Sequence, residues 1–420
     1  MSHTIKPGDY VIVQRQRYTK LYKVKPKGNL TLGYFIIEID KVIGEPYETI
    51  FQMKPKQDSK KLYSLEKVEQ LTTISQLNIE SSGKDNRNIT DDGTSQSLTK
   101  EEIIKLKDES LSSADIVGKL INNSKTFSSK TEYSQEKYMK KKEKKYFEYV
   151  QFRKPTLRLL VQMYYRQEPA KILGLRIDDV SQILTYGNVQ AGGNFILYDS
   201  GTSGLMTASI LNSIGANTEG CLIHMHPGNE CQKNAVLALQ FPQEQLDRCI
   251  NVNLYSVLRC FYQNEDSYCE NDNQTKELDC DEKTETTESK IETAGNKRKL
   301  SSDNSEMPPP KKACWQYDNE KACKILTNKV DGLIITCKEH PVNIFKELVS
   351  FLKGSRTFVV FHLMREPLEE LYVHLKTTLE FISLRLSNNF MRNYQVLPDR
   401  THPEVNMSSG GYILTGFKLS

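Results

Sequence analysis

The fold is indicated most directly by residues 195–215, which read FILYDSGTSGLMTASILNSIG. A short apolar run at 195–198 is followed by a polar loop that contains Asp199 and two glycines. The apolar residues beyond the loop recur with helical spacing as far as Ile214, and Gly215 follows as a helix stop signal. The segment therefore predicts a buried strand, a tight loop and a helix, in that order.

Similar strand–helix units recur further along the chain. Apolar runs at 221–225, 332–335 and 358–361 are each followed by a stretch that favours a helix. Alternation of this kind is typical of a doubly wound, mostly parallel sheet. We therefore expect the α/β class, with a Rossmann-like sheet. Residues 394–397 and 411–414 are expected to close the sheet as an antiparallel pair.

The amino-terminal part of the chain has a different pattern. Three β-rich runs, at 10–13, 34–39 and 48–53, are separated by turn residues. Short strands at such spacings predict a small, barrel-like β domain. Residues 1–79 carry 13 Lys and Arg against 8 Asp and Glu, which leaves a local excess of five positive charges.

These patterns predict three regions along the chain. We expect a β-rich domain at 1–79, a polar linker and helical segment at 80–147, and the Rossmann-like domain at 148–420. An insert at 264–314 is expected to interrupt the last of these. Within it, residues 265–292 hold eleven acids and three lysines with few large apolar side chains, so disorder is predicted there.

Two basic clusters follow the acidic part of the insert, Lys297-Arg298-Lys299 and Lys311-Lys312. One interpretation is a bipartite nuclear-import signal, which would place the protein in the nucleus. The other is a set of basic residues scattered through a hydrophilic loop. Composition alone leaves both open.

Residues 130–145 contain seven lysines and three glutamates. Tyr138 lies among them, and Tyr146 follows directly after them. Their propensities predict a helix, and Thr99 with Glu102 has the spacing of a capping box for an earlier one. The lysines are either a solvated face or a ridge that contacts phosphates. The residues proposed for the second role are Lys137, Lys140, Lys141, Lys142, Lys144 and Lys145.

Composition excludes several classes of protein. With 57 Lys and Arg against 53 Asp and Glu, the formal charge is +4, a total that argues against a nucleic-acid partner but hides its distribution. Mean hydropathy is −0.55, and no apolar run approaches about 18 residues, so no membrane-spanning helix is expected. The first residues lack an apolar signal core, so secretion is not expected. The nine cysteines form no C-x-x-C pair, so neither a disulfide framework nor a zinc site is predicted.

Sheets of this kind hold S-adenosylmethionine in one class of methyltransferases. Such a site needs glycines after the first strand and an acid at the end of the next, which accepts hydrogen bonds from both ribose hydroxyls. Here Gly201 and Gly204 remain, but Ser203 stands in the place of the middle glycine. His224 occupies the position of the acid, and Thr336 that of a reacting-base residue.

A degenerate cofactor site is therefore defined by six residues: Asp199, Gly201, Ser203, Gly204, His224 and Thr336. We therefore expect no catalytic residue and no cofactor bound by this chain. His224 and His226 would share one face of a strand, but a third ligand is not evident, so no metal is predicted.

Several longer stretches carry a more specific signal. They are residues 85–88 and 97–99, the lysine-rich segment 134–146, KILGLR at 171–176, SQILT at 181–185, YQVLPDRTHP at 394–403 and MSSGGY at 407–412. These stretches resemble the non-catalytic subunits of eukaryotic tRNA (adenine-58-N1)-methyltransferases. The resemblance extends from residue 5 to the end of the chain, apart from the acidic insert.

The resemblance implies an RNA enzyme that depends on two subunits. In that family a paralogous catalytic subunit binds S-adenosylmethionine and methylates the tRNA. The subunit resembled here contributes tRNA binding within a nuclear dimer of heterodimers. The resemblance also implies that His224 stands where the ribose-binding acid would be, and Thr336 where the catalytic aspartate would be. We therefore expect a non-catalytic, tRNA-binding subunit whose partner holds the cofactor.

The expected tRNA contacts are the six lysines named above, with Arg392 and Arg400 as further candidates. Arg400 and His402 lie between two prolines, so a purely structural role in a loop is equally open for them. The interface with the partner is expected on the sheet domain, where segments such as 368–386 offer apolar helices. Two other functions stay open: an active S-adenosylmethionine-dependent RNA methyltransferase, and a purely structural scaffold.

Overall fold

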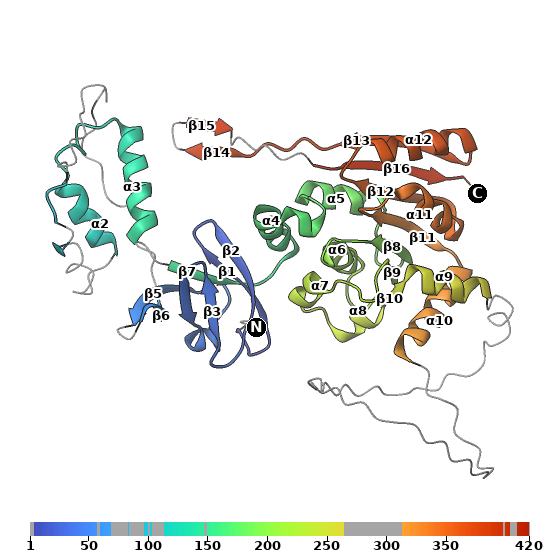
Figure 1. Ribbon diagram of the computed structural model, residues 1–420, viewed down its shortest axis with the longest axis horizontal. Helices are drawn as coiled ribbons and strands as arrows, with labels where there is room; N and C mark the ends of the chain where they lie inside the picture. The colour runs from blue at the N-terminus through green and yellow to red at the C-terminus, as the bar shows by residue number, and fades with distance from the viewer. Residues whose placement is uncertain are drawn as a thin grey trace, which may run out of the picture. The chain divides into compact units, whose positions relative to one another are not determined.

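The computed structural model describes residues 4–56, 59–68, 83, 96–99, 101–102, 113–146, 149–263, 313–397, 400–403 and 410–419. The chain divides into two compact units, each with its own seven-stranded sheet (Figure 1). The first unit comprises Met1–Ile177, Ser203–Ala208 and Lys233–Pro242. The second comprises Asp178–Thr202, Ser209–Gln232 and Gln243–Ser420.

The sheet of the first unit is strongly curled. Its strands are β1 (Tyr10–Arg15), β2 (Tyr18–Lys23), β3 (Asn29–Leu32), β4 (Phe35–Glu38), β5 (Ile50–Lys56), β6 (Ser59–Lys67) and β7 (Tyr149–Arg153). They are arranged in the order β2-β1-β7-β5-β6-β4-β3. The two edge strands are linked where the Lys20 ammonium donates to the Thr31 carbonyl oxygen at 2.7 Å. The sheet is thus nearly closed, as the predicted barrel-like domain requires.

The predicted boundary at residue 148 is wrong. Strand β7 pairs antiparallel with both β1 and β5, so residues 149–153 belong to the first sheet. Burial explains the pairing, because Phe152 is fully buried and its ring centroid lies 5.5 Å from that of Phe51. The sequence pattern also fails to reveal β2 and β6, whose polar side chains obscure the alternation, and β3, which has only four residues.

Helices α2 (Ser113–Asn122) and α3 (Glu132–Tyr146) lie between β6 and β7 in the chain, and α4 (Leu157–Gln167) follows β7. Two short 3-10 helices, at Asp40–Val42 and Pro169–Ile172, complete this part. The predicted capping box is confirmed, because the Thr99 N–H donates to Glu102 Oε2 at 2.8 Å and Thr99 Oγ1 accepts from the Glu102 N–H at 3.3 Å. The helix predicted from the lysine-rich stretch is confirmed as α3.

The second sheet has the predicted Rossmann-like architecture. Its strands are β8 (Phe195–Asp199), β9 (Leu222–His226), β10 (Cys249–Asn253), β11 (Val330–Thr336), β12 (Leu352–His362), β13 (Phe381–Asn388) and β16 (Tyr412–Lys418). They lie in the order β10-β9-β8-β11-β12-β16-β13. The first five are parallel, and β16 runs antiparallel between β12 and β13.

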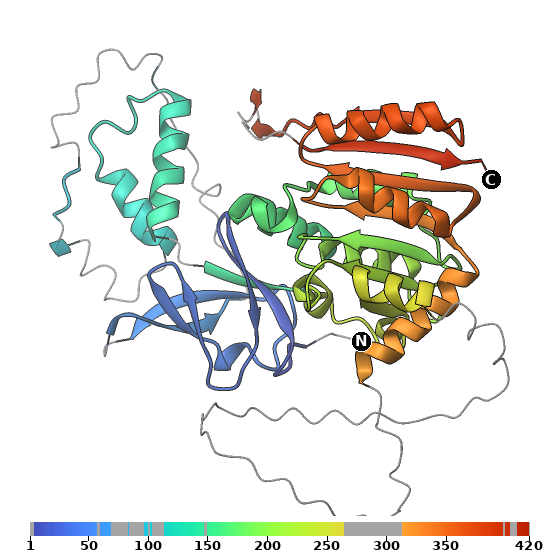
Figure 2. The same cartoon turned by 45° about the vertical axis from the view of Figure 1, so that its right-hand side comes forward.

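Helices flank this sheet on both faces (Figures 1 and 2). The helices that follow α4 in the chain are α5 (Ile177–Tyr186), α6 (Leu205–Ile214), α7 (Asn234–Leu239), α8 (Gln243–Asp247), α9 (Leu254–Gln263), α10 (Cys314–Thr327), α11 (Pro341–Leu348), the 3-10 turn Val349–Phe351 and α12 (Glu366–Thr378). Of these, α7 belongs to the first unit, where it contacts β1. All five residues of β8 are buried, which explains its continuous apolar run. None of the helices in the described part of the chain is long and apolar enough to cross a membrane.

The predicted pairing of residues 394–397 with residues 411–414 is wrong. Residues 394–397 form β14 (Tyr394–Leu397), which pairs with β15 (Arg400–Pro403) in a separate hairpin. The partners of β16 are β12 and β13 instead. Strand β13 is hard to detect in the sequence because its register shifts between Ile382 and Arg385, where Ser383 adopts a φ of 53°.

The predicted insert falls almost wholly outside the described residues. Helix α9 ends at Gln263 and α10 begins at Cys314, so the insert's expected last residue belongs to a helix. Both basic clusters lie between these helices, among residues that the structure does not describe.

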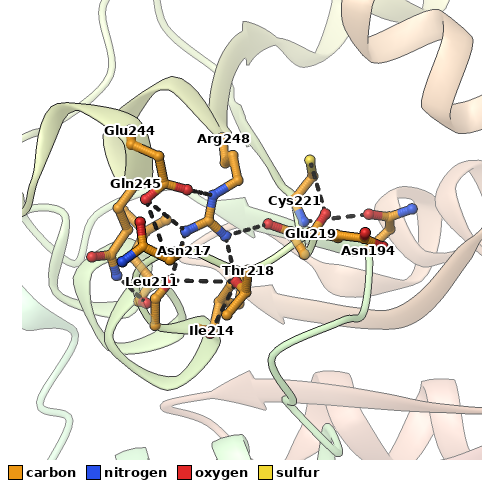
Figure 3. Close-up of polar contacts among 12 residues, drawn as sticks. Asn194, Leu211, Ile214, Asn217, Thr218, Glu219, Cys221, Glu244, Gln245 and Arg248 are labelled. Carbon is orange, nitrogen blue, oxygen red and sulfur yellow. Dashed lines mark hydrogen bonds and ion pairs between the residues drawn. The ribbon is translucent and has the colours of Figure 1, made fainter.

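Arg248 joins helix α8 to the loop between α6 and β9, at the amino-terminal ends of the parallel strands (Figure 3). Its Nε donates to Glu244 Oε1 at 2.7 Å, and its Nη1 to Thr218 Oγ1 at 2.8 Å. Its two terminal nitrogens also donate to the carbonyl oxygens of Gly220 and Gly215, at 2.7 and 2.6 Å. The Gly215 carbonyl lies at the carboxyl end of α6, where the positive charge of Arg248 also complements the helix dipole.

We predict that Arg248→Ala lowers the free energy of unfolding of the second unit by about 2–4 kcal/mol, because three part-buried acceptors lose a charged donor. Trp315, the chain's single tryptophan, lies on α10 in the same unit, so its fluorescence during urea unfolding reports the change. The control is Arg259→Ala, since Arg259 is exposed and donates to Gln263 one turn away at 3.1 Å. Equal midpoints for the two variants would contradict the assigned role of Arg248.

Candidate functional site

The order of the parallel strands reverses at β8 and β11. Strand β8 connects through α6 to β9 on one side, whereas β11 lies on its other side. In open sheets of this class, ligands bind outside the carboxyl ends of the strands at such a reversal. Asp199 ends β8 and Thr336 ends β11, so two of the residues singled out from the sequence stand side by side there.

The loop after β8 keeps a glycine-type backbone although one glycine is absent. Ser203 adopts a φ of 56° and Gly204 a φ of 74°. Positive φ is uncommon for a residue other than glycine. The Ser203 hydroxyl donates to the carbonyl oxygen of Lys171 at 2.8 Å, which anchors the serine in this conformation.

The Asp199 carboxylate is bonded to its own loop. Oδ1 accepts from the backbone N–H groups of Gly201 and Thr202, at 3.0 and 2.9 Å. Oδ2 accepts from the hydroxyl of Thr202. Asp199 is only 5% exposed, so the carboxylate acts as an internal brace and not as a group directed at a ligand.

Lys338 covers the face of Gly201 that a side chain would occupy. A Cβ at Gly201 would lie 2.5 Å from Cε of Lys338 and 2.9 Å from its Nζ. The backbone of Lys338 is fixed nearby, because its N–H donates to the Ser200 hydroxyl at 2.8 Å. One face of the glycine loop is therefore in contact with this chain's own lysine.

His224 is held within the sheet by its neighbour. Its Nδ1 lies 2.9 Å from Oδ1 of Asn251, which stands opposite it on β10. The imidazole is 2% exposed, and its ring centroid is 5.9 Å from that of His226. Among the described residues, no group of three or more His, Cys, Asp or Glu side chains is placed to hold a metal ion.

The carboxyl end of β11 offers no reactive group. Thr336 is buried, and its hydroxyl lies 3.4 Å from the carbonyl oxygen of Tyr198. Burial, followed by the nearby carboxylates of Glu339 and Asp199, raises the pKa of Cys337 to about 12. A thiol with that pKa stays protonated at neutral pH and is a poor nucleophile.

Asp331, the one carboxylate on β11, lies near the strand's other end. Partial burial alone would raise its pKa. The N–H of Asn194, at 3.1 Å, and the ammonium of Lys353, at 2.9 Å, hold the pKa of this carboxyl below its ordinary value. Asp331 thus acts as a structural tie between the starts of neighbouring strands.

The six lysines predicted as RNA contacts all lie on α3. Lys137 and Lys141 are exposed. Lys142 and Lys130 place their ammonium groups 5.1 and 5.3 Å from the Tyr138 ring centroid. Tyr138 also contacts the buried Phe127, with the two ring centroids 5.5 Å apart. The side chains of Lys140, Lys144, Lys145 and Tyr146 lie outside the described set.

The two predicted arginines lie by the β14–β15 hairpin of the second unit. Arg392 is exposed and its guanidinium is 5.4 Å from the ring centroid of Phe390. Arg400 begins β15, and its side chain is not among those described. Among the described side chains, Arg392 makes no contact with the loop that follows β8.

The sequence pattern does not reveal Lys338 and Asn251. Each acts on a residue far away in the chain, Lys338 on Gly201 and Asn251 on His224. Their roles depend on the pairing of β11 with β8 and of β10 with β9. No local motif marks either residue.

Comparison with known proteins agrees with this picture of the fold. Residues 4–292 match the model of the Gcd10p family. The mouse protein named tRNA (adenine(58)-N(1))-methyltransferase non-catalytic subunit TRM6 is 33% identical, over 99% of this chain and 89% of its own length. The corresponding non-catalytic subunit of Dictyostelium discoideum is 31% identical, over 100% of this chain and 80% of its own length.

A solved structure shares the fold. It is a SAM-dependent O-methyltransferase from Thermotoga maritima, with a TM-score of 0.50 and 13% sequence identity. The match covers 99% of this chain and 95% of that one. At this identity the likeness establishes the methyltransferase-type architecture and nothing about activity.

We predict that Cys337 resists alkylation while Cys314 reacts readily. Cys314 is exposed at the start of α10, whereas Cys337 is buried with its pKa raised to about 12. At pH 8, labelling by iodoacetamide is expected to be more than about a hundredfold slower at Cys337, because so little thiolate is present. Peptide mass spectrometry measures both sites, and labelling after denaturation is the control. Equal rates in the folded chain would contradict the assigned burial of the thiol.

Proposed function

The chain belongs to the Gcd10p family, and from that premise we propose that it is the non-catalytic, tRNA-binding subunit of a tRNA (adenine-58-N1)-methyltransferase. A paralogous catalytic subunit would carry out N1-methylation of an adenine in the T-loop. The observation that carries the proposal is the near full-length similarity to non-catalytic subunits, combined with an edge of the sheet that lacks the acids a methyltransferase needs.

The residues at the carboxyl edge do not fit S-adenosylmethionine. Asp199 is bonded to its own loop, and His224, which replaces the ribose-binding acid, is bonded to Asn251. A single imidazole cannot accept hydrogen bonds from two ribose hydroxyls, and Thr336 supplies no base. We infer that the partner subunit holds the cofactor and that this chain carries out no chemical step.

The proposed contribution of this subunit is affinity for tRNA. Chemistry on a base inside a folded RNA requires that base to be extracted, which costs a few kcal/mol. Phosphate contacts by a second subunit offset this cost without taking part in the reaction. The exposed Lys137 and Lys141 of α3 are the described side chains best suited to such contacts.

We place the interface with the catalytic subunit on the second unit, within a dimer of heterodimers. Large apolar side chains are exposed along α12, β13 and the β14–β15 hairpin: Val373, Leu379, Ile382, Phe390, Tyr394 and Val396. Phe390 is 82% exposed and Leu379 80%. An apolar surface of this kind is typical of obligate subunit contacts. The basic clusters at 297–299 and 311–312 support a nuclear location, on sequence alone.

We predict that the purified chain does not bind S-adenosylmethionine, whereas its assembly with the catalytic subunit binds the cofactor and methylates tRNA. Isothermal titration of the chain alone, the partner alone and the assembly separates these cases. Micromolar binding by the chain alone would show an active methyltransferase and overturn the proposal. A partner that binds and methylates tRNA equally well without this chain would leave it as a scaffold only.

We predict that Lys137→Ala combined with Lys141→Ala weakens tRNA binding by the assembly and lowers its salt dependence. For each lysine that meets a phosphate in a duplex-like region, its removal should reduce the slope of log K against log salt concentration by about 0.9. The matched control is Lys346→Ala, a single exposed lysine on α11 in the second unit. An unchanged affinity and slope in the α3 variant would assign these lysines to a solvated surface.

A further inference from the structure

Two hairpins of the first sheet end in turns of the same kind. The β1–β2 turn consists of Gln16 and Arg17, and Gln16 has a φ of 56°. The β3–β4 turn consists of Gly33 and Tyr34, and Gly33 has a φ of 60°. A positive φ at the first residue is the geometry of a type II′ hairpin turn. Arg17 and Tyr34 therefore occupy equivalent second positions in the two turns.

Side-chain contacts bring the two hairpins together. The Arg15 guanidinium lies 4.4 Å from the ring centroid of Phe35, which follows the second turn directly. The Lys20 ammonium donates to the carbonyl oxygen of Thr31 at 2.7 Å. Strand β6 adds Lys61 to the same end of the sheet, because the next residue, Leu62, stands opposite Ile36 of β4.

This end of the sheet is cationic and carries exposed rings. No aspartate or glutamate occurs from Tyr10 to Ile37, and four cations lie at this end of the sheet: Arg15, Arg17, Lys20 and Lys61. Tyr34 is 87% exposed and Tyr18 is 45% exposed. Arg17 and Lys61 are also exposed. Cations interleaved with solvent-facing aromatic rings are the pattern by which proteins bind unpaired nucleotides.

We propose that these residues, Arg15, Arg17, Tyr18, Lys20, Tyr34 and Lys61, form a turn tip that binds an unpaired stretch of RNA. Tyr34 stacks on one base, and Arg17 and Lys61 contact the neighbouring phosphates. The set contains four cations and no acid, which favours an RNA partner. Because protein interfaces are also enriched in tyrosine and arginine, a protein contact is one outcome that the test separates. The inference rests on the proposed function, because tRNA is the RNA that the assembly would bind. It adds a second RNA site, formed by residues other than those of α3.

The test uses the full chain assembled with its catalytic subunit, and unmodified tRNA titrated over a series of salt concentrations. Tyr34→Ala is expected to weaken binding about tenfold or more with an unchanged salt slope, because it removes stacking only. Arg17→Ala is expected to weaken binding and lower the slope by about 0.7, the value for one phosphate of a single strand. Tyr34→Trp should bind as the wild type does, since it retains a stacking ring.

Matched controls come from exposed residues of the same types. Tyr255→Ala removes a ring that is 74% exposed on α9, and Lys41→Ala removes an exposed cation of the first unit. Neither should change tRNA affinity. A thermal unfolding curve for each variant shows whether the fold is kept, and the 87% exposure of Tyr34 predicts that it is.

The outcomes separate this proposal from the function on which it rests. If Tyr34→Ala and Arg17→Ala bind tRNA as tightly as the wild type while the α3 variant binds weakly, the turn tip is not an RNA site and the proposed function stands. If the assembly binds tRNA no better than the catalytic subunit alone, the proposed function fails. If Tyr34→Ala separates the subunits on gel filtration, the turn tip is a protein contact, and the RNA proposal is overturned.

Discussion

The turn between β8 and α6 depends on the carboxylate of Asp199. This group accepts two backbone N–H groups and one hydroxyl from its own loop, and it is almost fully buried. A carboxylate bonded in this way is satisfied without a ligand. Two further contacts within the chain lie near the carboxyl ends of the strands: Lys338 with Gly201, and His224 with Asn251. The polar groups that could contact a cofactor at this end of the sheet therefore bond to other residues of the chain.

Hydrogen bonds within the chain stabilise both ends of the parallel strands. At the amino-terminal ends, Arg248 and Asp331 tie loops and strands together through charged hydrogen bonds. At the carboxyl ends, where ligands usually bind in this class of fold, the polar groups are also bonded internally. The second sheet is thus stabilised by internal polar contacts at both ends of its parallel strands. Its exposed apolar surface, on α12, β13 and the β14–β15 hairpin, is the surface that we propose for the partner.

The sequence predicts what local patterns control. The span of α6 and the burial of β8 follow from one apolar run, one loop and one glycine, and the capping box at Thr99 follows from a spacing of three residues. Pairing between distant strands is not encoded locally. For that reason the sequence pattern places β7 in the wrong domain and conceals β13, whose register shifts. The same limit explains why Ser203, His224 and Thr336 stand out as departures from a motif, while Lys338 and Asn251 do not stand out at all.

Charge distribution shows why a near-neutral total does not exclude an RNA partner. The formal charge is +4, yet the stretch from Tyr10 to Ile37 contains six cations and no acid, and eleven acids gather at residues 265–292. Binding responds to the local field, because charges further away than about 10 Å are largely screened at ordinary salt. Six to ten phosphate contacts change affinity by about 10³–10⁵ across moderate salt concentrations, which corresponds to about 4–7 kcal/mol. That range exceeds the few kcal/mol needed to extract a base. A subunit without catalytic groups can therefore determine whether methylation proceeds, provided that its cations are concentrated on the surface that meets the RNA.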